Sequence, residues 1–293
     1  MKFEINRKLN WLPSNDVHNF SRIKVLEDKL AAFYQNSPDY YSEIDFTVDN
    51  WVDKNEIGYQ QIVTFAHESQ LICEFGCGSA NLLKHYPELC NRYSGCDFSK
   101  KLIKQNMKKY PAATFNMINK PNELPFEDEK YDLVFSVFVL EHCTFPSKVL
   151  DECFRILKPE GRLVILCPNF LAKGRMSSQR AGWSEGTTTE KLRKGKYLDA
   201  VITFFDNRIR IPLLCILKKQ LAKKQPRFLI NVTPTVFVDR FNPDVDAVYV
   251  TYKNEIVQYL RNKFQIESNS DTVELYEKSK KLIFLSLRKM IIS

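Results

Sequence analysis

Two glycines and two acids, placed at the ends of short apolar runs, have the types and spacing that suit ligand binding. Residues 71–83 (LICEFGCGSANLL) begin as an apolar run, pass Glu74, and turn through Gly76 and Gly78 into a new apolar segment. This order predicts a strand, a tight turn and the start of a helix. Glycine suits such a turn because the backbone must bend sharply and approach a ligand with no Cβ in the way. Free N–H groups at the start of the helix favour a negative group there.

A second acid stands at the distance that a nucleoside-binding fold requires. Asp97 lies 19 residues after Gly78 and closes another short apolar run. At the tip of a neighbouring strand, its carboxylate is placed to accept hydrogen bonds from two ribose hydroxyls. A dinucleotide-binding turn would have its last glycine three residues after Gly78, where the chain has Asn81. The pattern therefore argues against a dinucleotide, although a glycine turn of another doubly wound protein remains an alternative.

The run EFGCGSA at residues 74–80 resembles the first motif of class I S-adenosylmethionine-dependent methyltransferases, E/D-x-G-x-G-x-G, with Ala80 in place of the third glycine. Further stretches, NELPFEDEKYDLVFSVFVLEH and RILKPEGRLVILCPN, resemble later motifs of the same family in the same order. The resemblance covers roughly residues 70–169 and implies a type 11-like methyltransferase with S-adenosylmethionine as cofactor. The residues that it assigns to the cofactor are Glu74, Gly76, Cys77, Gly78, Asp97, Phe98, Asn119, Leu124 and Val137.

One position departs from the family pattern. An acid often stands four residues before the Leu of the LPF motif, where it contacts the adenine amino group. Here that position is Lys120, with Asn119 before it and Glu123 after it. We expect Asn119 to take over the adenine contact.

The catalytic candidates follow the fourth strand. Methyl transfer needs alignment above all, and a hydroxyl acceptor also needs a base for its proton. Glu141 and His142 lie where substrate and cofactor meet in this family, and histidine suits the role of base because its ordinary pKa is near ~6.5. The His of this L-E-H triplet could instead orient a loop. Asp239, Asp244, Asp246 and Tyr249 are further candidates that the sequence does not rank.

Composition excludes several classes of protein. The eight cysteines contain no Cys-x-x-Cys pair and the four histidines are scattered, which favours buried thiols in a reducing cytosol over disulfides or a metal centre. The amino terminus has no apolar core of signal-peptide length, and no segment reaches ~18 uninterrupted apolar residues. We therefore expect a cytoplasmic protein, with the inner membrane face as an alternative place of peripheral attachment.

Alternating strand and helix patterns predict an α/β fold: a Rossmann-like, mostly parallel sheet of seven strands, with two antiparallel strands at its edge as in the family. We divide the chain into a helical leader (1–69), a cofactor-binding core (70–169), an inserted helical, basic cap (170–245) and the last part of the core (246–293). Expected strands are 71–75, 93–97, 113–118, 132–137, 162–167, 264–266 and 281–287; expected helices are 22–34, 57–67, one from 80–81, 99–109, 146–157 and 254–263.

The positive charge is concentrated in the insert. Residues 171–230 carry 14 Lys and Arg against 4 Asp and Glu, a net charge of +10, whereas the whole chain carries +8. Within it, residues 198–221 are apolar with basic interruptions, which is typical of an amphipathic element on a lipid surface or over a pocket, or of a helical cap with a solvated face. The Asn/Asp-Pro-Pro-aromatic motif common in nucleic-acid amino-methylating enzymes is absent after the fourth strand, so nucleic acid is not expected.

A basic amphipathic cap followed by D-x-D-A-V-Y resembles methyltransferases of bacterial surface-polysaccharide pathways. This resemblance implies O-methylation of a sugar, nucleotide-linked or lipid-linked, with basic residues on its phosphate. Two alternatives remain: a small-molecule methyltransferase of natural-product or quinone type, and a non-catalytic cofactor-binding protein that docks through its basic cap. The substrate-binding candidates are Arg208, Arg210 and Tyr249.

Overall fold

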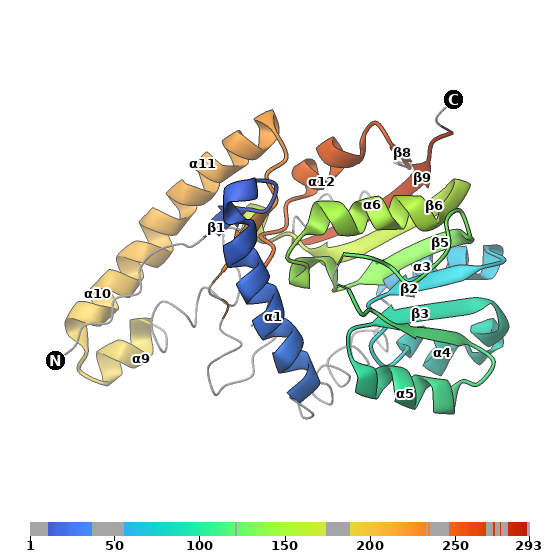
Figure 1. The fold of residues 1–293 in the computed structure, drawn as a ribbon. Helices are drawn as coiled ribbons and strands as arrows, with labels where there is room; N and C mark the ends of the chain where they lie inside the picture. Colours follow the sequence, from blue (N-terminus) through green and yellow to red (C-terminus); the bar gives the residue numbers. More distant parts are fainter. Residues whose placement is uncertain are drawn as a thin grey trace.

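A seven-stranded sheet forms the centre of the protein (Figure 1). The computed structural model describes residues 11–36, 56–120, 122–173, 188–232, 234, 246–267, 272, 276 and 281–291, with the side chains of 206 and 207 left out. The strand order is β4-β3-β2-β5-β6-β9-β8. All pairs are parallel except those of β9, which runs against both of its neighbours. The strands are β2 (Ile72–Phe75), β3 (Tyr93–Asp97), β4 (Thr114–Met117), β5 (Tyr131–Val137), β6 (Leu157–Pro168), β8 (Phe264–Ile266) and β9 (Leu282–Lys289).

This architecture confirms the expected Rossmann-like α/β fold and its antiparallel edge pair. Most boundaries differ by three residues or fewer, and one strand start differs by five. The strand expected from residue 162 begins at Leu157, because Tyr131 pairs with Leu157 before the register shifts and resumes at Leu133 and Arg162. Gly161 lies in this irregular stretch, where a Cβ would come within 2.9 Å of the Lys158 carbonyl oxygen. The turn expected at residues 158–161 is therefore an irregular stretch inside a longer strand.

Helices cover both faces of the sheet because the buried strands are apolar on both sides. Cys73, Val134 and Ile165 face one core, which also holds apolar residues of α6 and α12. Ile72, Phe135 and Val164 face the other, which α3, α4 and α5 complete. The helices are α3 (Ile57–Glu68), α4 (Asn81–His85), α5 (Lys100–Lys109), α6 (Pro146–Ile156) and α12 (Lys253–Leu260), with 3-10 turns at Pro87–Arg92 and Leu140–His142.

The leader and the insert meet outside the main sheet. Strand β1 (Trp11–Pro13) pairs antiparallel with β7 (Leu229–Asn231), and neither strand was expected from the sequence. After a 3-10 turn at Val17–Asn19, α1 (Phe20–Asn36) buries Ile23, Leu26 and Leu30 in the core of the sheet's α6 face. The leader and the insert thus cover the same side of the sheet.

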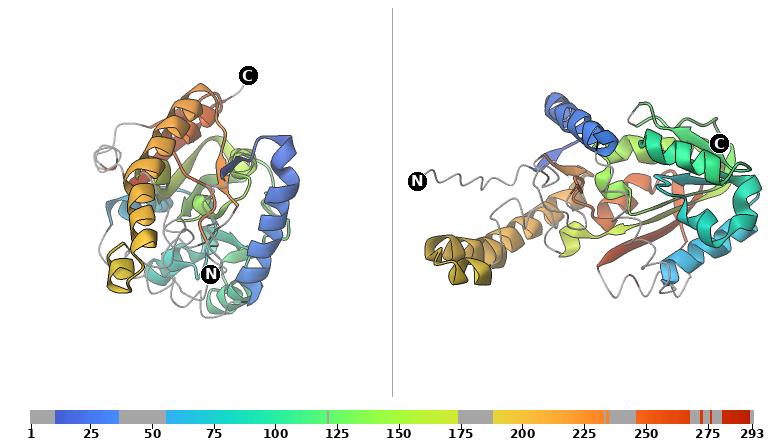
Figure 2. Two further views of the ribbon diagram at one scale, coloured as in Figure 1. Left: turned by 90° about the vertical axis from the view of Figure 1, so that its left-hand side faces the viewer. Right: turned by 90° about the horizontal axis from the view of Figure 1, so that it is seen from below.

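The insert forms a helical projection, called the arm below and comprising residues 188–224. It contains α9 (Thr188–Arg193), α10 (Tyr197–Phe205), a π-helical turn (Asp206–Arg210) and α11 (Ile211–Lys224); α7 (Phe170–Lys173) lies before it. Figures 1 and 2 show α10 and α11 as one long element that extends away from the sheet. Pro212 does not interrupt it, because it lies in the first turn of α11, where proline is tolerated. Within the described residues, no helix combines the length and apolar character needed to cross a bilayer.

Candidate active site

The turn after β2 lies where the strand order reverses, between β2 and β5, the usual ligand site of an open α/β sheet. Gly76 and Gly78 have φ of +70° and +48°, a region that favours glycine, and Ala80 has φ of 56°. The N–H groups of Gly76 and Cys77 donate to the Cys96 carbonyl at 2.8 and 3.0 Å. The turn is therefore joined to the neighbouring strand β3 and has a defined shape without a ligand.

The two glycines face different surroundings. A Cβ on Gly76 would come within 2.5 Å of Val139, so this glycine is needed for packing against the loop after β5. A Cβ on Gly78 would meet no atom within 4 Å. The backbone of Gly78 thus borders open space, and its own polar groups are held in place: its N–H donates to Asp97 at 3.1 Å and its carbonyl accepts from Asn106 at 2.8 Å. This open, fixed backbone fits the methionine part of S-adenosylmethionine, as the motif implies.

Two carboxyl groups lie beside this space. Asp97, at the end of β3, accepts hydrogen bonds from the Ser99 and Gly78 N–H groups, which leaves further lone pairs for ribose hydroxyls. Burial raises the pKa of Asp97, although these N–H groups act in the opposite direction. Glu74 is 7 % exposed, and the Tyr93 hydroxyl donates to it. Burial raises the pKa of Glu74 to about 8 despite that hydrogen bond. A cationic ligand would favour the ionised form of both acids.

The other cofactor candidates contribute in different ways. The Cys77 side chain is buried over Gly95, where a Cβ would lie 2.9 Å from its Sγ, so Cys77 offers its backbone. Phe98 and Val137 are half-buried at the carboxyl ends of β3 and β5. Asn119 is exposed beyond β4. The structure therefore gathers the predicted residues at one edge of the sheet, and their contacts with the cofactor remain predictions.

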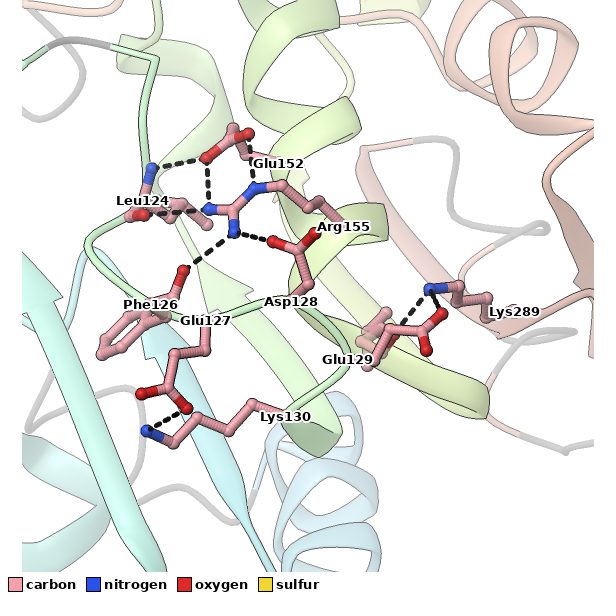
Figure 3. A network of polar contacts seen from close by, with 10 residues as sticks. Leu124, Phe126, Glu127, Asp128, Glu129, Lys130, Glu152, Arg155 and Lys289 are labelled. Atoms are coloured by element: carbon pink, nitrogen blue, oxygen red, sulfur yellow. Dashed lines mark hydrogen bonds and ion pairs between the residues drawn. The ribbon is translucent and has the colours of Figure 1, made fainter.

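The LPF loop is held by one arginine (Figure 3). Arg155 of α6 donates to the carbonyls of Leu124 and Phe126 at 3.0 and 2.8 Å, and it pairs with Glu152 and Asp128. Glu152 in turn accepts from the Leu124 N–H at 2.8 Å. Burial alone would raise the pKa of Glu152, but these hydrogen bonds outweigh it and lower the pKa. Leu124 is 5 % exposed, so it forms part of the buried wall of this edge.

His142 lies in the same loop as Val139, which packs on Gly76. Its Nδ1 is 3.1 Å from Oδ2 of Asp246, and its side chain is 23 % exposed. The same Oδ2 accepts a hydrogen bond from the hydroxyl of Tyr34 in α1 at 2.7 Å. A carboxylate on one imidazole nitrogen favours the tautomer in which the other nitrogen accepts a proton. The 3.1 Å distance is that of an ion pair between the imidazole and the carboxylate, and the role of His142 as a base stays a prediction.

Glu141 connects Asp246 to this loop through the backbone. Its carbonyl accepts from the N–H groups of Val248 and Tyr249, both at 2.8 Å, which fixes the segment that begins with Asp246. The Glu141 side chain is fully buried, and its Oε1 lies 3.9 Å from Nε2 of His142. Glu141 therefore flanks the imidazole and does not face solvent. Of the two catalytic candidates, only His142 has a partly exposed side chain.

The structure separates the substrate-binding candidates. Tyr249 is fully buried, and its hydroxyl donates to Glu255 at 2.9 Å, so it packs in the core and is not brought to the site. Arg208 and Arg210 lie on the π-helical turn of the arm, Arg208 exposed and Arg210 half-buried. Asp239 and Asp244 fall outside the described residues. No group of three or more His, Cys, Asp or Glu suited to a metal occurs in the part of the chain that the structure describes.

Sequence reasoning missed Tyr34 and left Asp246 unranked. Tyr34 carries no motif, and its signal, a polar residue on an apolar-periodic helix, is common in soluble proteins. Asp246 occurs next to an apolar run, as do many surface acids. Only the fold brings these residues to His142, across more than 100 positions of sequence in each case.

Comparisons with known proteins cover the part of the chain that contains the glycine turn. Residues 73–165 match the family model described as "Methyltransferase domain". A "Probable S-adenosylmethionine-dependent methyltransferase" of Mycolicibacterium smegmatis is 28 % identical over 121 residues, 41 % of this chain and 46 % of that protein. The demethylmenaquinone methyltransferase of Chlamydia trachomatis is 25 % identical over 154 residues, 52 % of this chain and 63 % of that protein. The chain thus spans about half to three fifths of these relatives.

Among solved structures, the 1,6-didemethyltoxoflavin-N1-methyltransferase of Burkholderia thailandensis is similar with a TM-score of 0.48 at 12 % identity, covering 94 % of this chain and 91 % of that one. The family match spans β2 to β6 and includes the glycine turn, Asp97 and the loop of His142. Residues 73–165 are therefore similar to a methyltransferase domain.

Proposed function

We propose that the whole chain is an S-adenosylmethionine-dependent methyltransferase that methylates a hydroxyl group, with His142 as its general base. The observation that carries this proposal is the 3.1 Å contact between His142 and the buried carboxylate of Asp246, in the loop whose Val139 packs on Gly76. Methyl transfer to an acceptor that is already a strong nucleophile requires no base, whereas a neutral hydroxyl must lose a proton. A histidine held by a carboxylate is suited to that proton transfer.

Each residue of the site has a distinct task in this proposal. When bound, S-adenosylmethionine supplies an electrophilic methyl group on a sulfonium. The Gly78 backbone and Asp97 hold the cofactor, and Nε2 of His142 accepts the proton of the acceptor hydroxyl. Asp246 orients the imidazole through Nδ1, and Tyr34 holds Asp246. The positive charge that develops on His142 is stabilised by Asp246 and Glu141, both of which are buried.

The acceptor that we propose first is a sugar hydroxyl of a nucleotide-linked or lipid-linked glycan intermediate. Its support is the concentration of positive charge in the insert, where Arg208 and Arg210 flank Ile209 on one turn. Arginine binds phosphate well because its planar group donates two parallel hydrogen bonds. Phosphate recognition would then come from the arm and proton transfer from the sheet edge.

A quinone-type acceptor is the second candidate, and the names of relatives favour it. Besides the demethylmenaquinone methyltransferase, a Caenorhabditis elegans 2-methoxy-6-polyprenyl-1,4-benzoquinol methylase is 37 % identical over 70 residues, 24 % of this chain and 25 % of that protein. A quinol also carries hydroxyls, so the same His142 would serve. The two candidates differ in the phosphate, which a free quinol lacks.

The test combines cofactor binding with label transfer. Calorimetry with S-adenosylhomocysteine measures the pocket, and radiolabelled S-adenosylmethionine is then offered with nucleotide sugars, lipid-linked sugars and quinols. Alkali-stable label on a sugar that depends on His142 supports the proposal, and label on the quinol alone selects the second candidate. Cofactor binding with no transfer to any fraction of a cell lysate would overturn both in favour of a non-catalytic protein that docks through its basic cap.

A further inference from the structure

The arm exposes a continuous apolar stripe. In α10 its members follow the i, i+4, i+7 spacing of one helix face, and in α11 the same spacing resumes after the π-helical turn. Each side chain is between 43 % and 67 % exposed, far more than the core residues of the sheet. The stripe consists of Tyr197, Leu198, Val201, Phe204, Phe205, Ile209, Leu213, Ile216 and Leu217.

The opposite face of the arm is packed, so the exposed stripe has a fixed direction. Ile211, Cys215 and Ala222 are buried in a cluster with Trp11 and Tyr252 of the body. In α10, Ala200 is buried, and Thr203 accepts a hydrogen bond from Lys191 of α9 at 3.0 Å. Buried apolar residues of α11 therefore anchor the arm to the body, while the residues of the stripe stay exposed. An exposed apolar area of this length marks an interaction site.

Charge identifies the partner. Residues 188–224 contain ten Lys and Arg against three Asp and Glu. One of those acids, Asp199, is paired with Lys191 at 3.3 Å. Exposed cations lie before α10 (Lys194 and Lys196), on the π-helical turn (Arg208) and at the end of α11 (Lys223 and Lys224), whereas α10 itself carries none. A partner surface that complements the arm would therefore have an apolar interior beneath a negatively charged outer layer.

From these observations we propose that the arm docks on an anionic lipid bilayer, with its apolar stripe in the outer part of the acyl region and its cations among the phosphates. Aromatic and aliphatic residues on one side of a helix with Lys and Arg beside them are typical of helices that lie in the interface plane. A second copy of this chain fits less well, because two strongly positive arms would face each other. The projection of the arm beyond the body lets a flat surface reach it (Figure 2).

Docking is independent of the proposed methyl transfer and is measured without it. The full chain is centrifuged with vesicles of phosphatidylcholine alone or with about one third phosphatidylglycerol. The wild type should bind the anionic vesicles about tenfold more tightly. The double variant Phe204→Asp/Phe205→Asp should weaken that binding about 30-fold, because two large side chains no longer enter the acyl region.

The matched control is Val25→Asp/Met107→Asp, which makes the same charge change at two exposed apolar residues of α1 and α5. It should change binding less than about threefold, since charge alone acts weakly at a distance from the surface. Lys223→Gln/Lys224→Gln should weaken binding to the anionic vesicles several-fold and leave binding to pure phosphatidylcholine unchanged. Thermal unfolding of each variant verifies that the fold is retained.

Three results would overturn the proposal. Equal binding to both vesicle types would show that anionic lipid is not required. Unchanged binding of the Phe204→Asp/Phe205→Asp variant would show that the apolar stripe does not contact the bilayer. Binding to neither vesicle would do so as well. If light scattering then shows a dimer that this variant dissociates, a second copy covers the stripe instead.

Discussion

The turn after β2 and the arm differ in how far other residues of the chain enclose them. The turn is bounded by its own chain: Gly76 is packed against Val139, and Cys96 and Asn106 bind its backbone groups. The arm has this kind of boundary on one face only, and its other face leaves Phe204 exposed. A ligand at the turn therefore meets a site that is already formed, which lowers the entropic cost of binding. The arm requires a partner to bury its apolar half.

The loop after β5 connects the turn to the leader and to the segment that follows the insert. Val139 in this loop closes on the glycine turn, and His142, three residues later, contacts Asp246. Asp246 follows the insert in sequence and binds Tyr34 of the leader. In the proposed function, His142 would therefore lie between the part that holds the cofactor and the part that receives the acceptor. Variants on each side should separate these tasks.

The largest effect is expected at the connecting loop. His142→Ala should lower kcat about 10³-fold, the contribution of a well-placed general base. The affinity for S-adenosylhomocysteine should stay unchanged, because the turn is bounded by other residues. Asp246→Asn should also lower kcat strongly and shift the pH profile of the reaction, since the amide no longer holds the imidazole in the tautomer whose Nε2 accepts a proton and removes the negative charge beside it.

The control for this kinetic experiment is His67→Ala, a substitution in α3, where the side chain is 43 % exposed. It should leave kcat unchanged. If His142→Ala retained the wild-type kcat, the reaction would need no base at this position. His142 would then not link the part that holds the cofactor to the part that receives the acceptor.

A smaller effect is expected at the turn itself. Gly78→Ala should weaken binding of S-adenosylhomocysteine about 30-fold, because the new Cβ occupies the space beside the backbone. Gly195→Ala in the arm is a matched control. That glycine also has a positive φ, and its Cβ would also meet nothing within 4 Å. Both variants carry the same backbone strain of about 1 kcal/mol, so equal affinities for the cofactor product would show that the open space at Gly78 is not its site.

The sequence predicted the first region well and the second poorly, for a physical reason. The turn is a local structure: a strand end, two glycines and an acid at fixed offset suffice to specify it, and the seven strands follow from apolar runs. The pairing of β1 with β7 joins two strands of three residues each, too short for a periodic signal. The contact of His142 with Asp246 depends on chain closure over more than 100 residues, which no local pattern reports.

The pKa of Glu74, beside the turn, gives a third test, with an expected effect of intermediate size. The pKa of Glu74 is raised to about 8 by burial, above its ordinary value near ~4.3, so the folded protein holds a proton there that the unfolded chain releases. This contribution to stability is complete below the unfolded pKa and is lost as the pH rises through about 8. Glu74→Gln removes it, so the melting temperature of the wild type should fall by about 5 °C relative to the variant between about pH 5 and pH 8.

Calorimetric melting over that range measures the difference, with the exposed Glu160→Gln as control. Parallel curves for the wild type and Glu74→Gln would mean that the carboxyl is already ionised in the folded protein. The turn would then carry a negative charge before a cationic ligand binds. Both the shape and the charge of the site would be in place in the unliganded protein.

The smallest effect is expected on the arm. Arg208→Gln/Arg210→Gln should raise the KM of a phosphate-bearing acceptor about threefold, because ion pairs near solvent contribute less than ~1 kcal/mol each. The affinity for S-adenosylhomocysteine and the KM of an acceptor without phosphate should not change. Lys223→Gln/Lys224→Gln, two exposed cations at the far end of α11, removes the same charge elsewhere on the arm. A rise in KM with both double variants would indicate a general electrostatic attraction between the arm and the acceptor. A rise with the arginine variant alone would locate phosphate recognition at the π-helical turn. No rise with either variant would show that the arm takes no part in acceptor binding.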